Sequence, residues 1–266
     1  MTGPIDPRLR QRRIAVLRAE GRRRLRIVLI VLGVITVGAG AYAITRSTAL
    51  DLDRIEVAGA SASRADDVIA ATGLELGTPL LDVDLDTARA GVTALPWVKE
   101  VDIARSWPGT VTVDVVRRQP LALVPSGDGG SVVIDAEGVA IDRIESQPAD
   151  DLPVITVVAR GELGDVQTFA LPAIPVIQLV PADLMPWIET YGIDYTGEEN
   201  GELVLDLTGS AIAELGIGTD LIAKLDALRT VIGRVDRTCI TVIDLRIAEL
   251  PVVQRDADCE IDEPES

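Results

Sequence analysis

The stretch WPGTVTVDVVRRQP, from Trp107 to Pro120, decides how the first folded part of the chain is built. Pro108-Gly109 fits the two central positions of a type II turn, where proline fixes one φ angle and glycine accepts a positive one. The valines of Val111–Val115 alternate with polar residues, which is the pattern of a half-buried strand. Pro120 cannot donate a hydrogen bond to a strand ladder. The stretch therefore predicts a short strand that leaves a tight turn and ends before Pro120.

The residues before this strand predict two helices and two further strands. The segments LDRIEVAG, Leu52–Gly59, and WVKEVDIARSW, Trp97–Trp107, both alternate like half-buried strands. Ser63 has an acidic residue three positions later, which is a helix-capping pattern, and a second helix begins near Asp84. The order strand, helix, helix, strand, strand within residues 50–119 predicts a small α+β module with three strands under two helices.

The N-terminal part of the chain combines a basic segment with an apolar one. Residues 1–26 contain nine arginines and two acidic residues, whereas the chain from residue 47 onward contains 15 basic and 40 acidic residues. Between them the uncharged stretch Ile27–Ile44, IVLIVLGVITVGAGAYAI, would reach about 27 Å as a helix, close to the thickness of a bilayer core. We predict a single transmembrane helix at 27–46. By the positive-inside rule the basic tail is cytoplasmic and the remainder of the chain is extracytoplasmic.

This apolar segment has two interpretations. Ala41-Tyr42-Ala43 has the small-x-small pattern of a signal peptidase site, so a cleaved signal peptide is the alternative. The long basic region before the segment and its nearly bilayer-spanning length favour an uncleaved anchor. We therefore predict a single-pass protein of the cell membrane that contacts the lipid bilayer through residues 27–46.

Composition excludes several kinds of chemistry. The chain contains no histidine, which excludes Ser-His-Asp and Cys-His catalysis and removes the commonest zinc ligand. The acidic extracytoplasmic part would repel nucleic acid. Asp82, Asp84 and Asp86 alternate like the start of a calcium loop, but Thr87 stands where glycine is needed and Thr93 where glutamate is needed. Capping of a helix start explains these acids better, so we predict no catalytic, cofactor or metal site.

The two cysteines, Cys239 and Cys259, both fall in the predicted extracytoplasmic part, where disulfides persist. A bridge between them would close a loop of about 20 residues and hold the C-terminal tail beside the last predicted strand. The alternative is two unrelated thiols, one buried in a strand and one in a mobile tail.

Residues 120–253 predict a β-rich domain with one packed helix. The segment SGDGG, 126–130, lies between two β-rich runs and is typical of a hairpin turn. Thr219 is placed to cap a helix whose leucines share one face, and Ile240–Ile247 alternates as a final strand. Residues 254–266 are acidic and lack periodicity, which predicts a disordered tail.

Four segments follow one another in an informative order: LDRIEVAG, GTPLLDVD, LPWVKEVDIARSWPGTVTVDVVRRQPLAL and IDAEGVAID. With the basic tail and the single span, they resemble the FtsQ/DivIB family of bacterial cell-division proteins over most of residues 27–253. The resemblance implies an α+β chain with a βααββ POTRA-type domain at 50–119 and an FtsQ-type β domain at 120–253. The proline-rich residues 170–186 depart from the family, whose members usually have a cleaner helix there.

The resemblance also implies a function. Members of the family are membrane-anchored, non-enzymatic scaffolds of the divisome. The β domain is therefore expected to recruit the single-span division proteins FtsB and FtsL. Through them it would be linked to the septal peptidoglycan synthase FtsW–FtsI, and the protein would be enriched at the division septum.

A partner-binding strand edge is implied at the C-terminal end of the β domain. Asp244 and Arg246 match the family's Asp-x-Arg, whereas Ile247 stands where the family often has tyrosine. An exposed edge offers unpaired N–H and C=O groups to which an extended peptide can add. The expected rungs of the added ladder are Ile247–Glu249 and Val252–Val253, and Arg246 is expected to face an acidic residue of the partner. The expected docking residues are therefore Arg246, Ile247, Glu249, Val252 and Val253. The alternative is that Pro251 simply ends the fold and that partners bind elsewhere.

Two other classes of protein share some of these features. A POTRA-bearing transport component usually carries several POTRA copies and a long barrel, and this chain has one copy and no room for a barrel. A membrane-anchored cell-wall hydrolase would need a carboxylate pair and a sugar-binding platform, but aromatic residues make up only 3% of the chain. The scaffold interpretation is therefore preferred.

Overall fold

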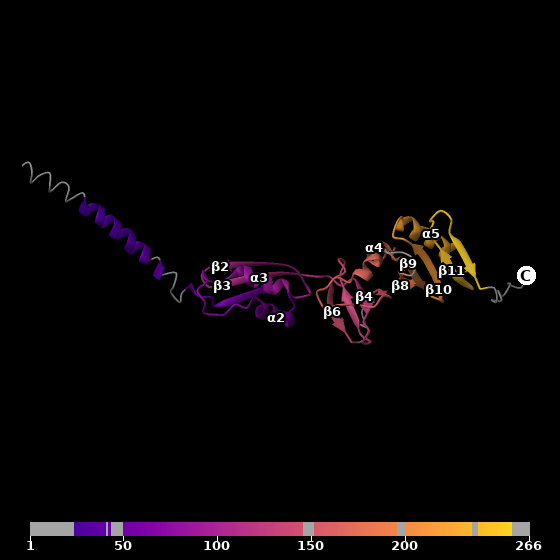
Figure 1. The fold of residues 1–266 in the computed structure, drawn as a ribbon, viewed down its shortest axis with the longest axis horizontal. Helices are drawn as coiled ribbons and strands as arrows, with labels where there is room; N and C mark the ends of the chain where they lie inside the picture. The colour runs from indigo at the N-terminus through magenta and orange to yellow at the C-terminus, as the bar shows by residue number, and fades with distance from the viewer. Residues whose placement is uncertain are drawn as a thin grey trace, which may run out of the picture. The chain divides into compact units, whose positions relative to one another are not determined.

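The computed structural model describes residues 24–40, 42–43, 50–145, 152–195, 201–235 and 239–256 (Figure 1). The chain divides into two compact units. One unit holds residues 1–89 and 102–114, and the other holds residues 90–101 and 115–266. Within the described ranges the strands form one three-stranded sheet and one nine-stranded sheet.

The first described residues, 24–40 and 42–43, are helical, and their large apolar side chains are exposed. In the part of the chain that the structure describes, no helix is both long enough and apolar enough to cross a bilayer. The predicted span 27–46 includes residues 41 and 44–46, which lie outside the described residues, as does most of the predicted basic tail.

The three-stranded sheet has the element order that the sequence predicts. Its elements are β1 (Arg54–Ala58), α2 (Ala62–Thr72), α3 (Leu85–Thr93), β2 (Val98–Ser106) and β3 (Thr110–Arg117). The strand order is β1-β3-β2, with β1 parallel to β3. The alternation around Val111–Val115 is confirmed, because these valines are buried and the residues between them are not. Helix α2 ends at Gly73, whose φ of 63° is the left-handed conformation that glycine adopts most easily.

The predicted helix starts are right at one place and wrong at two. The Asp84 carboxylate accepts hydrogen bonds from the N–H groups of Asp86 and Thr87 at 3.0 and 3.1 Å, so it caps α3 as predicted. Ser63 does not cap α2, because the helix already begins at Ala62 after an extended Ser61. Thr219 does not cap the later helix either, because Asp220 precedes its first residue in a left-handed conformation.

The nine-stranded sheet has the order β12-β11-β10-β9-β8-β7-β4-β5-β6. Its strands are β4 (Ala122–Pro125), β5 (Ser131–Ile134), β6 (Ala140–Ile144), β7 (Val154–Ile155), β8 (Ile188–Asp194), β9 (Glu202–Leu207), β10 (Ala211–Gly216), β11 (Ile240–Asp244) and β12 (Val252–Arg255). The predicted hairpin turn at 126–130 joins the antiparallel pair β4 and β5. Helix α5 (Leu221–Arg234) connects β10 to the parallel strand β11.

The proline-rich segment folds into short helical pieces rather than one helix. These are the 3₁₀ helix η2 (Thr168–Ala173), helix α4 (Ile174–Leu179) and the 3₁₀ helix η3 (Met185–Trp187). Pro172 lies inside η2 and Pro175 lies in the first turn of α4. Since a proline has no N–H group and clashes with the preceding turn, these residues keep the pieces short.

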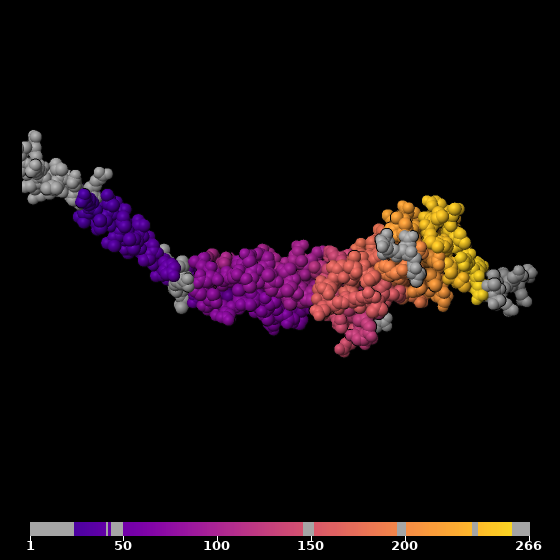
Figure 2. Space-filling view, in the orientation of Figure 1, coloured from indigo at the N-terminus to yellow at the C-terminus, as the bar shows by residue number. Residues whose placement is uncertain are grey.

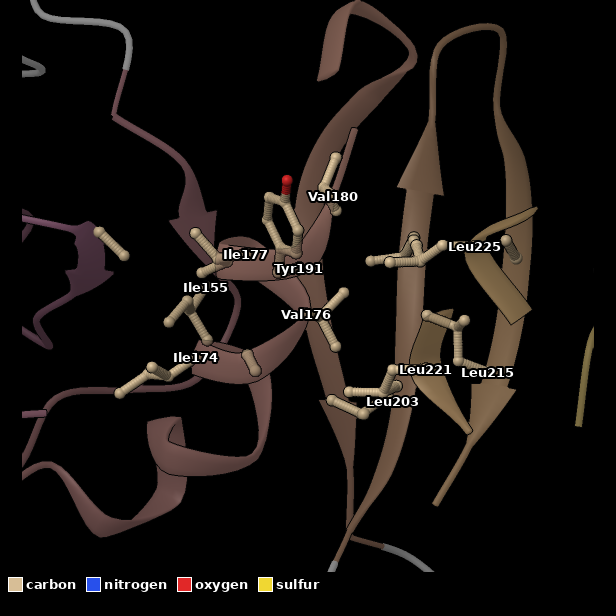
Figure 3. Close-up of a cluster of buried hydrophobic side chains, with 14 of the residues drawn as sticks. Ile155, Ile174, Val176, Ile177, Val180, Tyr191, Leu203, Leu215, Leu221 and Leu225 are labelled. Atoms are coloured by element: carbon tan, nitrogen blue, oxygen red, sulfur yellow. The ribbon is translucent and has the colours of Figure 1, made fainter. Parts of the chain in front are cut away.

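One face of the nine-stranded sheet packs against α4 and α5. Figure 3 shows Ile174, Val176 and Ile177 of α4 directed toward side chains of the sheet, with Leu221 and Leu225 of α5 alongside. The leucines of α5 are buried as the helical pattern predicts. Lys224 of α5 is also buried. Its Nζ donates to the carbonyls of Leu215 and Ile217 at 2.8 and 2.9 Å, and these hydrogen bonds satisfy the buried ammonium group.

Candidate partner-binding edge

Strand β12 is the last strand of the nine-stranded sheet and pairs only with β11 among the described elements. The two strands are antiparallel, with Val253 opposite Ile243 and Val252 opposite Asp244. In Figure 2 the last described residues, coloured yellow, lie at one end of the second unit. Val252 is 53% exposed, whereas Val253 is half-buried against the core of the domain. Two of the predicted docking residues therefore lie in the strand at the outer edge of the sheet, as far as the described residues define it.

The backbone of β12 alternates between the side that faces β11 and the free side. The N–H of Asp256 donates to the carbonyl of Cys239 at 2.9 Å, and the carbonyl of Gln254 accepts from the Thr241 hydroxyl at 3.3 Å. Residues 254 and 256 thus direct their backbone groups toward β11. Because successive residues of a strand point to opposite sides, the N–H and C=O groups of Val253 and Arg255 point outward.

Ile247 and Glu249 do not lie in a strand, so the prediction that they form rungs of a ladder is wrong. Strand β11 ends at Asp244, and the following residues turn back toward β12. The turn forms because the N–H of Arg246 donates to the Asp244 carboxylate at 3.0 Å and the N–H of Leu250 donates to the carbonyl of Ile247 at 3.1 Å. Ile247 is 59% exposed. Because it lies in a turn, it can contact a partner through its side chain but not as a rung of a strand ladder.

The charge of Arg246 is already paired within the chain. Its Nη2 lies 2.6 Å from the Asp244 carboxylate and 3.6 Å from the Glu214 carboxylate. The hydrogen bond and charge of Asp244 raise the pKa of Arg246, and the hydrogen bond from Arg246 lowers the pKa of Asp244. Gly216 allows this arrangement, because a Cβ atom there would lie 2.8 Å from the Arg246 Cγ. Arg246 therefore holds the β11–β12 turn, and two carboxylates surround its charge.

Cys239 directly precedes β11 and has a positive φ of 66°. It takes part in a disulfide bond. Cys259 lies outside the described residues, so its pairing with Cys239 stays a prediction.

Two family models match consecutive parts of the chain. The POTRA domain, FtsQ-type, matches residues 50–118, and the model of the cell division protein FtsQ/DivIB, C-terminal, matches residues 122–246. The chain belongs to the FtsQ/DivIB family. The second match ends at Arg246, so β12 and the docking residues after Arg246 lie beyond it.

Individual members of the family are similar over part of their length. The cell division protein FtsQ of Streptomyces venezuelae is 35% identical over 147 residues, which cover 55% of this chain and 52% of that protein. The FtsQ protein of Corynebacterium glutamicum is 34% identical over 118 residues, which cover 44% and 53%. The FtsQ protein of Caulobacter vibrioides strain NA1000 is 35% identical over 109 residues, which cover 41% and 36%. The chain spans about half the length, or less, of these relatives.

A charged cluster that includes Asp135 and Glu137 of the segment IDAEGVAID is not among the features that the sequence predicts. Arg118 donates to the Asp135 carboxylate at 2.6 Å and lies 3.3 Å from Glu137, which also pairs with Lys99 at 2.7 Å. The Asp135 side chain is only 2% exposed and also accepts from the N–H groups of Glu137 and Val139. The turn formed by Asp135 has a local sequence signal, an aspartate three residues before glycine, but the contact with Arg118 has none.

Proposed function

We propose that this protein is a membrane-anchored, non-enzymatic scaffold of the bacterial division machinery. The observation that carries the proposal is the outer edge of β12, which no other described strand covers, on a domain that belongs to the FtsQ/DivIB family. Such an edge binds an extended segment of another protein by adding it as a further strand. Main-chain hydrogen bonds then supply affinity, and the side chains next to the edge supply specificity.

The proposed partners are the single-span proteins FtsB and FtsL, with FtsB adding the strand. Through them the protein is linked to the septal synthase FtsW–FtsI. The outward backbone groups of Val253 and Arg255 make the ladder, and the exposed side chains of Val252 and Ile247 provide apolar contact. Because Asp244 and Glu214 surround Arg246, that residue positions the turn in this proposal and does not meet a partner carboxylate.

The proposed topology has the N-terminus in the cytoplasm and both sheet-bearing parts of the chain, residues 50–117 and 122–256, outside the membrane. It is supported by the change from a basic to an acidic chain across the uncharged stretch Ile27–Ile44. The exposed apolar side chains of the helical residues 24–40 also support it, since apolar surface of this kind is normally covered by protein or lipid.

A fluorescent fusion of the full chain tests the proposed function in the cells from which the gene comes. We expect the fusion to gather at mid-cell before constriction begins, and depletion of the protein to give filamentous cells. Uniform membrane fluorescence in dividing cells, together with normal division after depletion, would contradict the proposal.

A disulfide between Cys239 and Cys259 is the second expected property. The N–H of Asp256 reaches the carbonyl of Cys239 at 2.9 Å, so the chain passes Cys239 three residues before Cys259. Closing a loop of about 20 residues is worth roughly 3 kcal/mol in the chain-entropy model. In the denatured, non-reduced chain we expect no thiol to react with a thiol reagent, and one to react after Cys259→Ser. Two reactive thiols in the unmodified chain would exclude the bridge.

A further inference from the structure

Three exposed, large apolar side chains belong to one end of the three-stranded module, residues 50–117, which is the part of the first unit meant below. Leu76 is 65% exposed, Leu81 is 51% exposed and Trp107 is 55% exposed. Single exposed apolar residues are common on protein surfaces, but a group of them on one face indicates a contact with another apolar surface. The backbone hydrogen bonds of their neighbouring residues place Leu76, Leu81 and Trp107 at the same end of the three-stranded module.

Leu76 and Leu81 flank a segment that is paired with the first residues of the unit. The N–H of Gly77 donates to the carbonyl of Leu52, and the N–H of Leu52 donates to the carbonyl of Thr78, both at 2.8 Å. The N–H of Leu80 donates to the carbonyl of Leu50 at 3.0 Å. Residues 76–81 therefore lie beside residues 50–52, where the chain enters the unit.

Trp107 is attached to the same place through the tip of the β2–β3 hairpin, whose strands are labelled in Figure 1. The carbonyl of Gly109 accepts from the N–H groups of Asp53 and Arg54 at 2.7 and 3.2 Å. A Cβ atom at Gly109 would lie 2.6 Å from the carbonyl oxygen of Asp51, so only glycine allows this approach.

A second contact joins the hairpin to the segment that carries the leucines. Arg105, which precedes the tip of the hairpin, donates from Nε to the carbonyl of Leu80 at 2.9 Å and from Nη2 to the carbonyl of Val83 at 2.6 Å. Leu76, Leu81 and Trp107 thus surround the point at which the chain enters the unit.

The length of the chain limits how far this end lies from the membrane. The uncharged stretch ends at Ile44, and the described segment that carries the three-stranded sheet begins at Leu50. Six residues span at most about 20 Å even when fully extended. The three apolar side chains therefore lie on the part of the unit that the anchor holds closest to the bilayer.

We propose that Leu76, Leu81 and Trp107 form a membrane-contact surface that rests in the interfacial layer of the bilayer. The proposal depends on the membrane anchor of the proposed function. Tryptophan suits this role, because its ring is amphipathic and favours the boundary between lipid chains and head groups. The contact orients the first unit against the membrane, in addition to tethering it.

The charges near this surface indicate an apolar contact and not an electrostatic one. Four acidic residues lie beside the three apolar residues in the sequence or in the paired segments: Asp51, Asp53, Glu75 and Asp82. The two basic residues there, Arg54 and Arg105, leave an excess of negative charge. An anionic lipid surface would be repelled by this excess of carboxylates. The contact is therefore expected to be at least as strong with zwitterionic lipid as with anionic lipid.

Fluorescence quenching in reconstituted vesicles tests the inference. The full chain is placed in phosphatidylcholine vesicles that contain brominated lipid, and insertion is checked by resistance to extraction with alkaline carbonate. The chain has three tryptophans, of which Trp97 is 8% exposed and Trp187 packs against the core. We expect brominated lipid to quench part of the fluorescence, and that part to disappear in Trp107→Phe but to remain in Trp187→Phe.

A second variant tests the leucines with Trp107 in place. Leu76→Ser combined with Leu81→Ser should reduce the quenching of Trp107 at least about twofold, because the surface loses most of its aliphatic area. An inserted chain whose quenching is the same with and without Trp107 would overturn this inference and leave the anchor intact. A chain that carbonate releases would overturn the anchor and this inference together.

Discussion

Replacing Arg255 with proline is expected to weaken the binding of an FtsB-like partner at least about tenfold, a change of about 1.4 kcal/mol. The backbone N–H of Arg255 points away from β11, because the neighbouring residue Asp256 donates toward Cys239. Proline removes this outward donor, and its ring occupies space that an added strand needs. The pairing between β12 and β11 stays intact, since Gln254 and Asp256 keep the groups that face β11.

Arg255→Ala is the matched control for this variant. Alanine removes the same side chain but keeps the outward N–H group, so binding is expected to stay within about twofold of the unmodified chain. Calorimetric titration with the extracytoplasmic segment of the FtsB homologue from the same organism measures both affinities, and circular dichroism checks that both variants are folded. Equal affinity of the proline and alanine variants would exclude a ladder at this edge.

Asp135→Ala is expected to lower the free energy of unfolding of the second unit by about 3–5 kcal/mol, the cost typical of breaking a buried ion pair from one side. The variant leaves Arg118 without its 2.6 Å partner and deprives the N–H groups of Glu137 and Val139 of their acceptor. Urea unfolding of the purified chain measures the change. Glu137→Ala is the control, because Glu137 is exposed and its loss should cost less than about 1 kcal/mol.

The same carboxylate predicts a dependence of stability on pH. Burial alone would raise the pKa of Asp135, but the hydrogen bonds, first of all that from Arg118, outweigh it and hold the pKa below its ordinary value. The stability that Asp135 contributes is therefore complete above about pH 4 and is lost as the pH falls through the lower pKa of the folded state. Below pH 4, the stability of Asp135→Asn should fall less steeply with pH than that of the unmodified chain. Parallel curves for the two proteins would contradict this role.

The parts of the fold that the sequence predicts correctly depend on local patterns. Alternation of valines gives β3, apolar spacing gives α5, and the side chain of Asp84 gives the start of α3. Each of these signals lies within a few residues and needs no knowledge of the tertiary structure.

The errors arise where contacts between distant residues decide the structure. The final strand stops at Asp244 and not at Ile247, because Arg246 folds back on Asp244 and lies against Gly216 of the neighbouring strand. Arg118 and Asp135 are 17 residues apart, and only the fold brings them together. Pairing of this kind has no periodic signal in a single sequence. The expected rungs at Ile247–Glu249 therefore lie in a turn, whereas Val252 and Val253 lie in β12.

Amide hydrogen exchange of β12, with and without the FtsB homologue, tests the account most directly. In the free protein the N–H group of Val253 faces outward and should exchange quickly, whereas that of Asp256 is bonded to Cys239. Saturation with the partner should slow exchange at Val253 at least about tenfold, because this N–H group becomes a rung of the added ladder. Unchanged exchange at Val253 in a saturated complex would contradict the proposal that β12 is the docking edge.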